Sequence, residues 1–407
     1  MNLYKLIFYT GIVTTMISCY AKPKGISVNA GEAIQADLTP GSAPYFTTDA
    51  KGHVVMSWAQ EINDSTSQFC YAVSADNGRS FGKPIVIPGS GNLQAHSENL
   101  PKIIYKPSGD IIALWGIANP NPKNKYSGIV YYSSSHDNGV TWGEPRKLVT
   151  DTASYDQRYY DVALLPDGEA AIIWLDNRKQ GDKEGSSLYF ATTKGDSEFN
   201  DEQKITEGCC QCCRTDLFID SRSGIHVIYR GIIQDSIRDM LHTVSTDKGK
   251  TFSEPKLISN DRWVLAGCPH TGPAMTENKQ GLHFAWFTGG NQKGCFYTQS
   301  TDNGNTFVNR ERVSEMGSHP QIAELSGDRL LMAWDESFMN NGTYEKKIAV
   351  QLRGADGAAL ARQYITGEDA NTSYPVVAPL PDGTALIAYT RKAGLKSYIW
   401  YQQISFN

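Results

Sequence analysis

One eight-residue motif, which occurs four times along the chain, constrains the fold more than any other feature. Its clearest copy is Ser-Thr-Asp-Asn-Gly-Asn-Thr-Phe at residues 300–307. In each copy an aspartate can accept hydrogen bonds from backbone N–H groups just downstream, and a following glycine supplies the positive φ of a hairpin turn. We expect the closing aromatic residue to pack beneath the turn. The other copies occupy residues 74–81, 135–142 and 245–252.

The four copies resemble the Asp-box of the sialidase superfamily, whose pattern is S-x-D-x-G-x-[TS]-[WF]. In that family the box forms the turn between the third and fourth strands of a β-propeller blade. It fastens the blade and takes no part in catalysis. The resemblance therefore implies structural roles for Asp76, Asp137, Asp247 and Asp302.

The spacing of these turns predicts the number of blades. Turn centres recur roughly every 55 residues, a period typical of propeller blades, if worn copies near residues 195 and 356 are included. We predict an all-β chain forming a single propeller over residues 20–407, with seven four-stranded antiparallel blades. Six blades, as in catalytic sialidases, is the alternative. The last repeat lacks a fourth strand, and residues 26–38 could supply it and close the ring.

The N-terminus, residues 1–19, reads as an export signal. Lys5 precedes a largely apolar run over residues 6–17, which is too short to span a membrane. Residues 16–19, Met-Ile-Ser-Cys, resemble a bacterial lipobox, and this resemblance implies lipidation of Cys19. Ordinary signal cleavage near Ala21 is the alternative. We expect an exported protein anchored by lipid in the bacterial cell envelope, at the periplasm or the cell surface.

Composition limits the partners. The net charge is −5 and no basic run occurs, so nothing favours a nucleic-acid ligand. No second hydrophobic segment holds the protein in a membrane, so we expect membrane contact only through the lipid anchor. We expect a monomer whose partner is a glycan or another small molecule.

Propeller geometry predicts where a site would lie. The loops before each first strand and after each second strand emerge on one face around the axis, opposite the Asp-boxes, and propellers bind ligands there. Polar and soft side chains are concentrated at these positions. They are His96, Glu98, Asn99, Asp156, Arg158, Cys209, Cys210, Cys212, Cys213, Arg214, Cys268, His270, His319 and Tyr374, with Asp176, Arg178, Arg230, Asp335 and Arg391 at second-strand ends.

The sialidase resemblance implies a tyrosine nucleophile, and Tyr374, which begins a run ending in Leu-Pro-Asp-Gly, matches it. The rest of the catalytic set is replaced. Ser42 stands at the first arginine of the carboxylate clamp, His319 at the activating glutamate, and Asp335 at the second arginine, where it would repel a substrate carboxylate. We therefore expect no standard sialidase activity. Any enzyme here would be a sialidase-like exo-glycosidase, with Tyr374 and a different anion clamp drawn from Arg158, Arg178 and Arg230.

The stretch Cys209-Cys210-Gln211-Cys212-Cys213 is the most unusual in the chain, and Cys268-Pro269-His270 opens the next repeat at the same mouth. The set resembles a bacterial branch of exported sialidase-like proteins with a C-x-C-C motif. Three interpretations compete: disulfides, a redox or catalytic thiol, and a copper or zinc site. The metal set would be Cys209, Cys210, Cys212, Cys213, Cys268, His270 and His319. We expect Cys70 and Cys295, which lie within third strands, to be buried as small hydrophobic residues.

Two functions follow from these patterns. The first is a propeller that binds or acts on glycans at its axial mouth. The alternative is a non-enzymatic metal-binding propeller of the envelope, using the Cys/His cluster with copper or zinc. A protein-interaction scaffold is a third class, which would hold no metal and carry no pocket chemistry.

Overall fold

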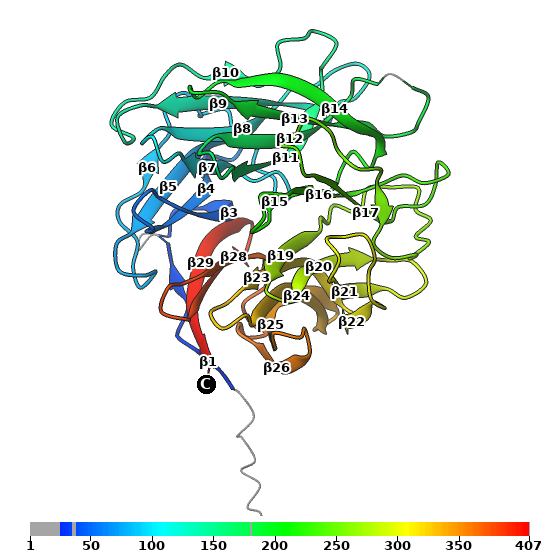
Figure 1. Cartoon of the computed structure of the whole chain (residues 1–407). Coiled ribbons are helices and arrows are strands. Elements are labelled where there is room, and N and C mark those ends of the chain that lie inside the picture. Colours follow the sequence, from blue (N-terminus) through cyan, green and yellow to red (C-terminus); the bar gives the residue numbers. More distant parts are fainter. Residues whose placement is uncertain (1–24, 35–37, 180, 407) are drawn as a thin grey trace, which may run out of the picture.

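The computed structural model describes residues 25–34, 38–179 and 181–406. Cys19, and with it the predicted export signal, lies outside these residues. Those described form β-strands and connecting turns, and they include no helix long and apolar enough to cross a membrane. The strands make seven antiparallel sheets (Figure 1).

Each sheet is one blade, and the chain visits the blades in order. Blade 1 has β3 (Gly41–Thr48), β4 (Val54–Asn63), β5 (Thr66–Ser74) and β6 (Ile85–Val86). Blade 2 has β7 (Lys102–Tyr105), β8 (Ile111–Ala118), β9 (Gly128–Ser135) and β10 (Arg146–Lys147). Blade 3 has β11 (Gln157–Leu164), β12 (Ala170–Asp176), β13 (Ser186–Thr193) and β14 (Phe199–Cys209).

The next three blades repeat this pattern. Blade 4 has β15 (Asp216–Ile219), β16 (Ile225–Arg230), β17 (Met240–Ser245) and β18 (Lys256–Leu257). Blade 5 has β19 (Ala274–Asn278), β20 (Gly281–Thr288), β21 (Gly294–Ser300) and β22 (Glu311–Ser314). Blade 6 has β23 (Gly317–Glu324), β24 (Leu330–Asn340), β25 (Thr343–Arg353) and β26 (Ala359–Tyr364).

Blade 7 joins the two ends of the chain. Its strands β27 (Thr372–Pro379), β28 (Ala385–Ala393) and β29 (Lys396–Phe406) come from the C-terminus, and β1 (Ile26–Val28) and β2 (Glu32–Ala33) pair with β29 on the outside. Figure 1 shows β1 beside the end of β29. The predictions of seven blades and of an N-terminal closing strand are confirmed.

The first strands line the axis in a closed ring, because each contacts the first strand of the next blade and β27 contacts β3. The core lies between neighbouring blades. Five second strands, in blades 1, 2, 3, 5 and 6, bury a tryptophan completely, and these bulky rings fill the space between sheets. They are Trp58, Trp115, Trp174, Trp286 and Trp334.

The four Asp-boxes fasten blades 1, 2, 4 and 5 to the blade that precedes each of them. In the box of blade 5, Asp302 accepts hydrogen bonds from the Thr306 backbone N–H (2.8 Å) and hydroxyl (2.7 Å). Gly304, at φ +78°, lies so close to the His242 ring of blade 4 that a Cβ would clash with it. Phe307 packs edge-on against the same ring. The turn therefore requires glycine for both its backbone angle and the close blade contact.

Candidate functional site

The antiparallel register sorts the loops into two faces. First-strand starts pair with second-strand ends, as Ser318 does with Asp335 and Thr372 with Arg391. Third strands start on this face and end in the Asp-boxes on the opposite one. We call the first face, around the ring of inner strands, the axial mouth.

An unusual backbone conformation recurs where inner strands leave the axial mouth. Ala43, Tyr159, His319 and Tyr374 have φ between 51° and 58°, and a register shift accompanies each of them. Such angles are strained for residues other than glycine, and they re-aim the side chain. Since Ala43 shares the feature without a functional side chain, the bulge belongs to the scaffold, and the residue placed on it differs from blade to blade.

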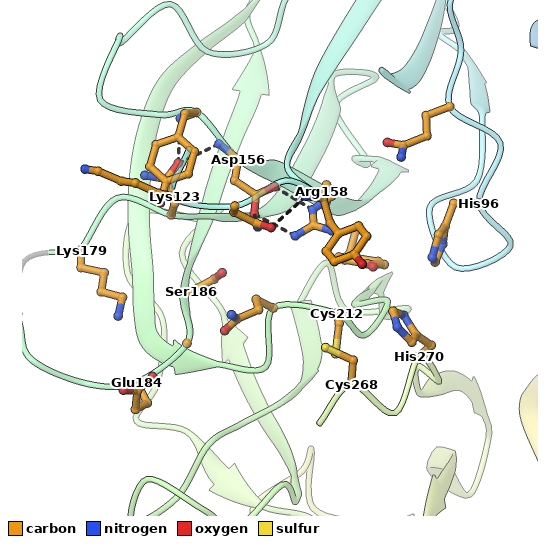
Figure 2. A pocket seen from close by; sticks show the side chains of 18 residues that line it. His96, Lys123, Asp156, Arg158, Lys179, Glu184, Ser186, Cys212, Cys268 and His270 are labelled. Atoms are coloured by element: carbon orange, nitrogen blue, oxygen red, sulfur yellow. Dashed lines mark hydrogen bonds and ion pairs between the residues drawn. The ribbon is translucent and has the colours of Figure 1, made fainter. Parts of the chain in front are cut away.

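A cavity of about 740 Å³ opens at the axial mouth between blades 2, 3, 4 and 5. We call it the mouth cavity. Figure 2 shows its labelled side chains converging from several loops. Its wall combines tyrosine rings with charged groups and with the sulfur and imidazole groups of the cysteine region. These side chains are Tyr126, Tyr155, Tyr159, Lys123, Lys179, Asp156, Glu184, Arg158, His96, His270, Cys212 and Cys268.

Arg158 reaches the mouth cavity but is already paired. Its Nε and Nη2 donate to the two carboxylate oxygens of Asp156 at 2.7 and 2.8 Å, and Asp156 also accepts from Asn124 at 2.9 Å. Burial lowers the pKa of Arg158, but the bonds to Asp156 outweigh it and raise the pKa overall. Lys123 and Lys179, by contrast, form no ion pair among the described residues. They are the cations of the cavity that remain available to an anionic ligand.

The other two predicted arginines lie elsewhere. Arg178 donates to Asp176 at 2.9 Å and to Glu202 at 2.6 Å. Arg230 is 1% exposed and donates to the backbone carbonyls of Arg238 and Phe287 at 2.9 and 2.8 Å. The structure therefore does not bring Arg158, Arg178 and Arg230 together in one clamp.

A second group surrounds Tyr374 at the start of β27. Asp335, fully buried, accepts hydrogen bonds from His319 Nδ1 at 2.6 Å, Lys346 Nζ at 2.8 Å and the backbone N–H of Tyr374 at 2.9 Å. Burial alone would raise the pKa of Asp335, but the charges of His319 and Lys346 outweigh it and lower the pKa to about 2. The Tyr374 and His319 rings are in contact, with centroids 4.0 Å apart. Asp335 thus faces His319 and Lys346 and is closed off from solvent.

Glu98 connects this group with the mouth cavity. Its carboxylate is 2% exposed, accepts the backbone N–H of Gly272 at 2.7 Å and lies 3.8 Å from Arg214 Nε. Burial raises the pKa of Tyr374 well above its usual value, and the charges of Glu98 and Asp335 add to the effect. Tyr374 is therefore a protonated phenol at neutral pH.

His96 extends the connection toward blades 3 and 5. Its ring lies 5.6 Å from the rings of both Tyr159 and His270. Burial lowers the pKa of His96, and the nearby His270 lowers it further. His96 therefore packs between Tyr159 of blade 3 and His270 at the entry to blade 5, in the wall of the mouth cavity.

The cysteine motif follows β14 and turns into β15. Cys210 Sγ lies 3.6 Å from Cys212 Sγ and 4.0 Å from Cys213 Sγ, and all three sulfurs are within 4.8 Å of one another. We call these three residues the thiol cluster; each is at most 3% exposed. Hydrogen bonds from the other two thiols lower the pKa of Cys210. No disulfide occurs among the described cysteines.

The remaining residues of the predicted metal set lie outside the thiol cluster. Cys209 is buried at the end of β14, and His319 forms a hydrogen bond with Asp335. Cys268 is exposed and lines the mouth cavity together with His270 and Cys212. Cys70 and Cys295 are fully buried in β5 and β21, as their positions predicted.

Several residues of the site were not selected from the sequence: the cavity residues Lys123, Tyr126, Tyr155, Lys179 and Glu184, and also Tyr159 and Lys346. Tyr159 follows Arg158 on the inner-strand bulge of blade 3, and aligning it with His319 and Tyr374 on the same bulge would have found it. Lys346 lies in a third strand, where no motif marks it. It reaches Asp335 because β24 and β25 form a long hairpin.

Comparison with known proteins identifies the fold. Residues 85–262 match the family described as BNR repeat-like domain. A protein of unknown function from Dyadobacter fermentans DSM 18053 has a TM-score of 0.56 at 14% identity, over 94% of this chain and 100% of that one. The polysaccharide lyase Uly1 has a TM-score of 0.54 at 14% identity, over 95% and 94% of the two chains.

The intramolecular trans-sialidase of Ruminococcus gnavus, solved with oseltamivir carboxylate, has a TM-score of 0.53 at 10% identity, over 91% of this chain and 96% of its own. No curated protein sequence matches the chain. At these identities the likeness establishes the fold and leaves the reaction open.

Proposed function

We propose that the chain binds acidic glycans at its axial mouth and acts on them there. The proposal is supported by the seven-bladed propeller fold, by the match of residues 85–262 to the BNR repeat-like domain family and by the likeness in fold to an intramolecular trans-sialidase. The observation that carries this proposal is the mouth cavity, which combines three tyrosine rings with charged groups able to form several hydrogen bonds. Its volume of about 740 Å³ lies in the usual range of small-molecule sites.

Charge favours an acidic ligand. Lys123 and Lys179 line the mouth cavity from different loops (Figure 2) and have no carboxylate partner among the described residues. The Arg158 guanidinium is neutralised by Asp156, so the charges left in the wall are those of the two lysines and of Glu184, with a positive excess. A carboxylate or sulfate on a sugar would complement it, with the tyrosine rings covering the apolar face of the sugar.

The group around Tyr374 can supply proton transfer. Since Asp335 accepts from His319 Nδ1, Nε2 of a neutral His319 keeps its lone pair and can act as a base. Tyr374 stays a phenol because its pKa is raised, so its hydroxyl can donate a hydrogen bond to negative charge that develops on the glycan, while His319 carries the proton. This assignment differs from a sialidase mechanism, in which the tyrosine attacks as a nucleophile.

The fold is compatible with either kind of chemistry. The similar structures include a polysaccharide lyase and an intramolecular trans-sialidase, so a propeller of this shape carries glycan reactions of more than one type. What this chain adds is its own set of side chains at the axial mouth. Those side chains, rather than the fold, must decide the reaction.

Binding is tested on an array of sialylated, uronate-containing, sulfated and neutral glycans. We expect signals from the acidic glycans, and we expect their loss in Tyr159→Ala and in the double variant Lys123→Ala/Lys179→Ala. The matched control is Lys83→Ala/Lys250→Ala, which removes the same charge from exposed lysines beside Asp-boxes on the opposite face. Equal losses in the two double variants would refute a specific site, as would binding of neutral glycans alone.

The reaction is tested separately on whichever glycan binds. We expect His319→Ala and Tyr374→Phe to abolish product formation while glycan binding is retained, because neither residue lines the mouth cavity. Undiminished turnover in both variants would show that the proton-transfer assignment is wrong. Binding without any product in the wild type would leave only the binding part of the proposal.

A further inference from the structure

We propose that the thiol cluster, Cys210, Cys212 and Cys213, is a binding site for a single Cu(I) ion. This inference does not depend on glycan binding. It rests on the spacing of the three sulfurs, on the charge that surrounds them and on a route from the mouth cavity.

The sulfur spacing fits one shared metal ion. Thiolate ligands lie about 2.3 Å from a d10 metal ion, so two of them at tetrahedral or trigonal angles are roughly 3.8–4.0 Å apart. The observed separations from Cys210 Sγ are 3.6 Å to Cys212 and 4.0 Å to Cys213. No other His, Cys, Asp or Glu among the described residues joins the group within 4.8 Å. The cluster therefore favours a soft metal ion that can be coordinated by three thiolates alone, and Cu(I) is such an ion.

The backbone holds the cluster in place before any ion binds. Cys210 N–H donates to the carbonyl of Arg230 at 2.8 Å, and Cys209, one residue earlier, forms a β-bridge with Gly231. The motif is thus fixed to the end of β16 in blade 4. A pre-positioned ligand set loses little conformational freedom on binding, which favours affinity.

Charge supplies the second, independent observation. Three thiolates with Cu(I) carry a net charge of −2, which is costly to bury unless cations lie nearby. Arg230 is 1% exposed, has no carboxylate at salt-bridge distance among the described residues, and its Nε has no hydrogen-bond partner. Its positive charge acts on both Cys210 and Cys213. A negatively charged metal–thiolate cluster would compensate this buried guanidinium.

The mouth cavity provides access. Cys212 belongs both to the thiol cluster and to the cavity wall, and the exposed Cys268 lies in the same wall. Figure 2 shows the side chains of Cys212 and Cys268 directed toward one another, with His270 beside them. We infer that Cys268 receives Cu(I) and passes it inward by ligand exchange. Each cluster thiol releases its proton to solvent as its bond to the ion forms.

The test uses the full chain, purified without oxygen and titrated with Cu(I) against a coloured competing chelator, and separately with Zn(II). We expect one Cu(I) per chain, a higher melting temperature on loading, and three sulfur neighbours at about 2.3 Å by X-ray absorption. Cys212→Ser should bind no Cu(I) at the same chelator concentration. Cys209→Ala, an equally buried cysteine of the same motif, is the matched control and should bind as the wild type does.

Further results separate the alternatives. Cys268→Ser should keep the stoichiometry and load more slowly; loss of binding there would overturn the three-thiol assignment. Binding of Zn(II) in place of Cu(I), or a disulfide mapped between two cluster cysteines in the anaerobic protein, would also overturn the proposal. If Cys212→Ser fails to fold, the sulfur count of the copper-loaded wild type decides, because fewer than three sulfur neighbours is incompatible with the site.

Discussion

Replacing Asp335 by asparagine should destabilise the propeller in a pH-dependent way. The carboxylate is fully buried and accepts from His319, Lys346 and the Tyr374 backbone. An asparagine has the same shape, but its NH₂ group would face one of these three donors. The change removes the negative charge that holds the His319 and Lys346 side chains and orients the Tyr374 backbone.

The magnitude follows from the pKa of Asp335. A fall from an ordinary value near 3.9 to about 2 corresponds to roughly 2–3 kcal/mol of stabilisation by the ionised carboxylate at neutral pH. Because the folded-state pKa is the lower one, this stabilisation is complete above the unfolded pKa and is lost as the pH falls through the folded value. About half of it should remain at pH 3. For a chain of this length, the loss at pH 7 lowers the melting temperature by about 3 °C.

The assay is urea unfolding followed by tryptophan fluorescence at pH 7 and pH 3, with wild type and Asp335→Asn compared at each pH. Asp201→Asn, which removes an exposed carboxylate, is the control and should change stability by less than about 0.5 kcal/mol. We expect the difference between wild type and Asp335→Asn to shrink by about half at pH 3. An equal difference at both pH values, or none at pH 7, would contradict the charge-based account of this group.

Three other predictions address the turns, the reaction and the N-terminus. Asp302→Ala should lower the free energy of unfolding by about 1–2 kcal/mol, because Thr306 loses two hydrogen bonds. Glycan binding on the opposite face should not change. Loss of glycan binding at unchanged stability would refute this prediction. A generic sialoside should not be hydrolysed measurably, since Ser42 and Asp335 stand where clamp arginines are expected, and turnover that disappears in Tyr374→Phe would show this to be wrong. Metabolic labelling with a lipid precursor should mark the wild type and not Cys19→Ala, and equal labelling of the two would exclude lipidation at Cys19.

The architecture could be predicted because it depends on interactions between residues that are close in the sequence. The Asp-boxes combine short-range hydrogen bonds with a glycine required by close contact with the preceding blade, so the motif identifies the turn in four blades. The count of seven followed once the worn turns near residues 195 and 356 were included. The closing strand followed because blade 7 lacked an outer strand in the C-terminal sequence.

The site could be predicted only in part, because it depends on contacts between blades. The positions of His319 and Tyr374 at the axial mouth follow from the topology. Their contact depends on the positive-φ bulges, and no sequence pattern predicts these bulges. Asp335 was predicted to face a substrate carboxylate, yet it is buried against His319 and pairs with Lys346 of the adjacent strand β25.

Pairing of arginines was, in contrast, readable from spacing. Asp156 and Arg158, and likewise Asp176 and Arg178, are two residues apart, a separation that places side chains on the same face of an extended strand. Both pairs form ion pairs in the structure. This spacing would have excluded both arginines as candidates for a clamp that is free to bind an anion.

Hydrogen–deuterium exchange with a bound glycan tests the central claim, that the axial mouth binds acidic glycans, most directly. The ligand is the acidic oligosaccharide that gives the strongest array signal, at saturating concentration. We predict slower amide exchange in the loops around the mouth cavity, at residues 92–99, 121–127 and 153–159, and unchanged exchange in the Asp-box turns at residues 74–81, 245–252 and 300–307. Protection confined to the Asp-box face, or no protection of the mouth loops at saturation, would contradict the account.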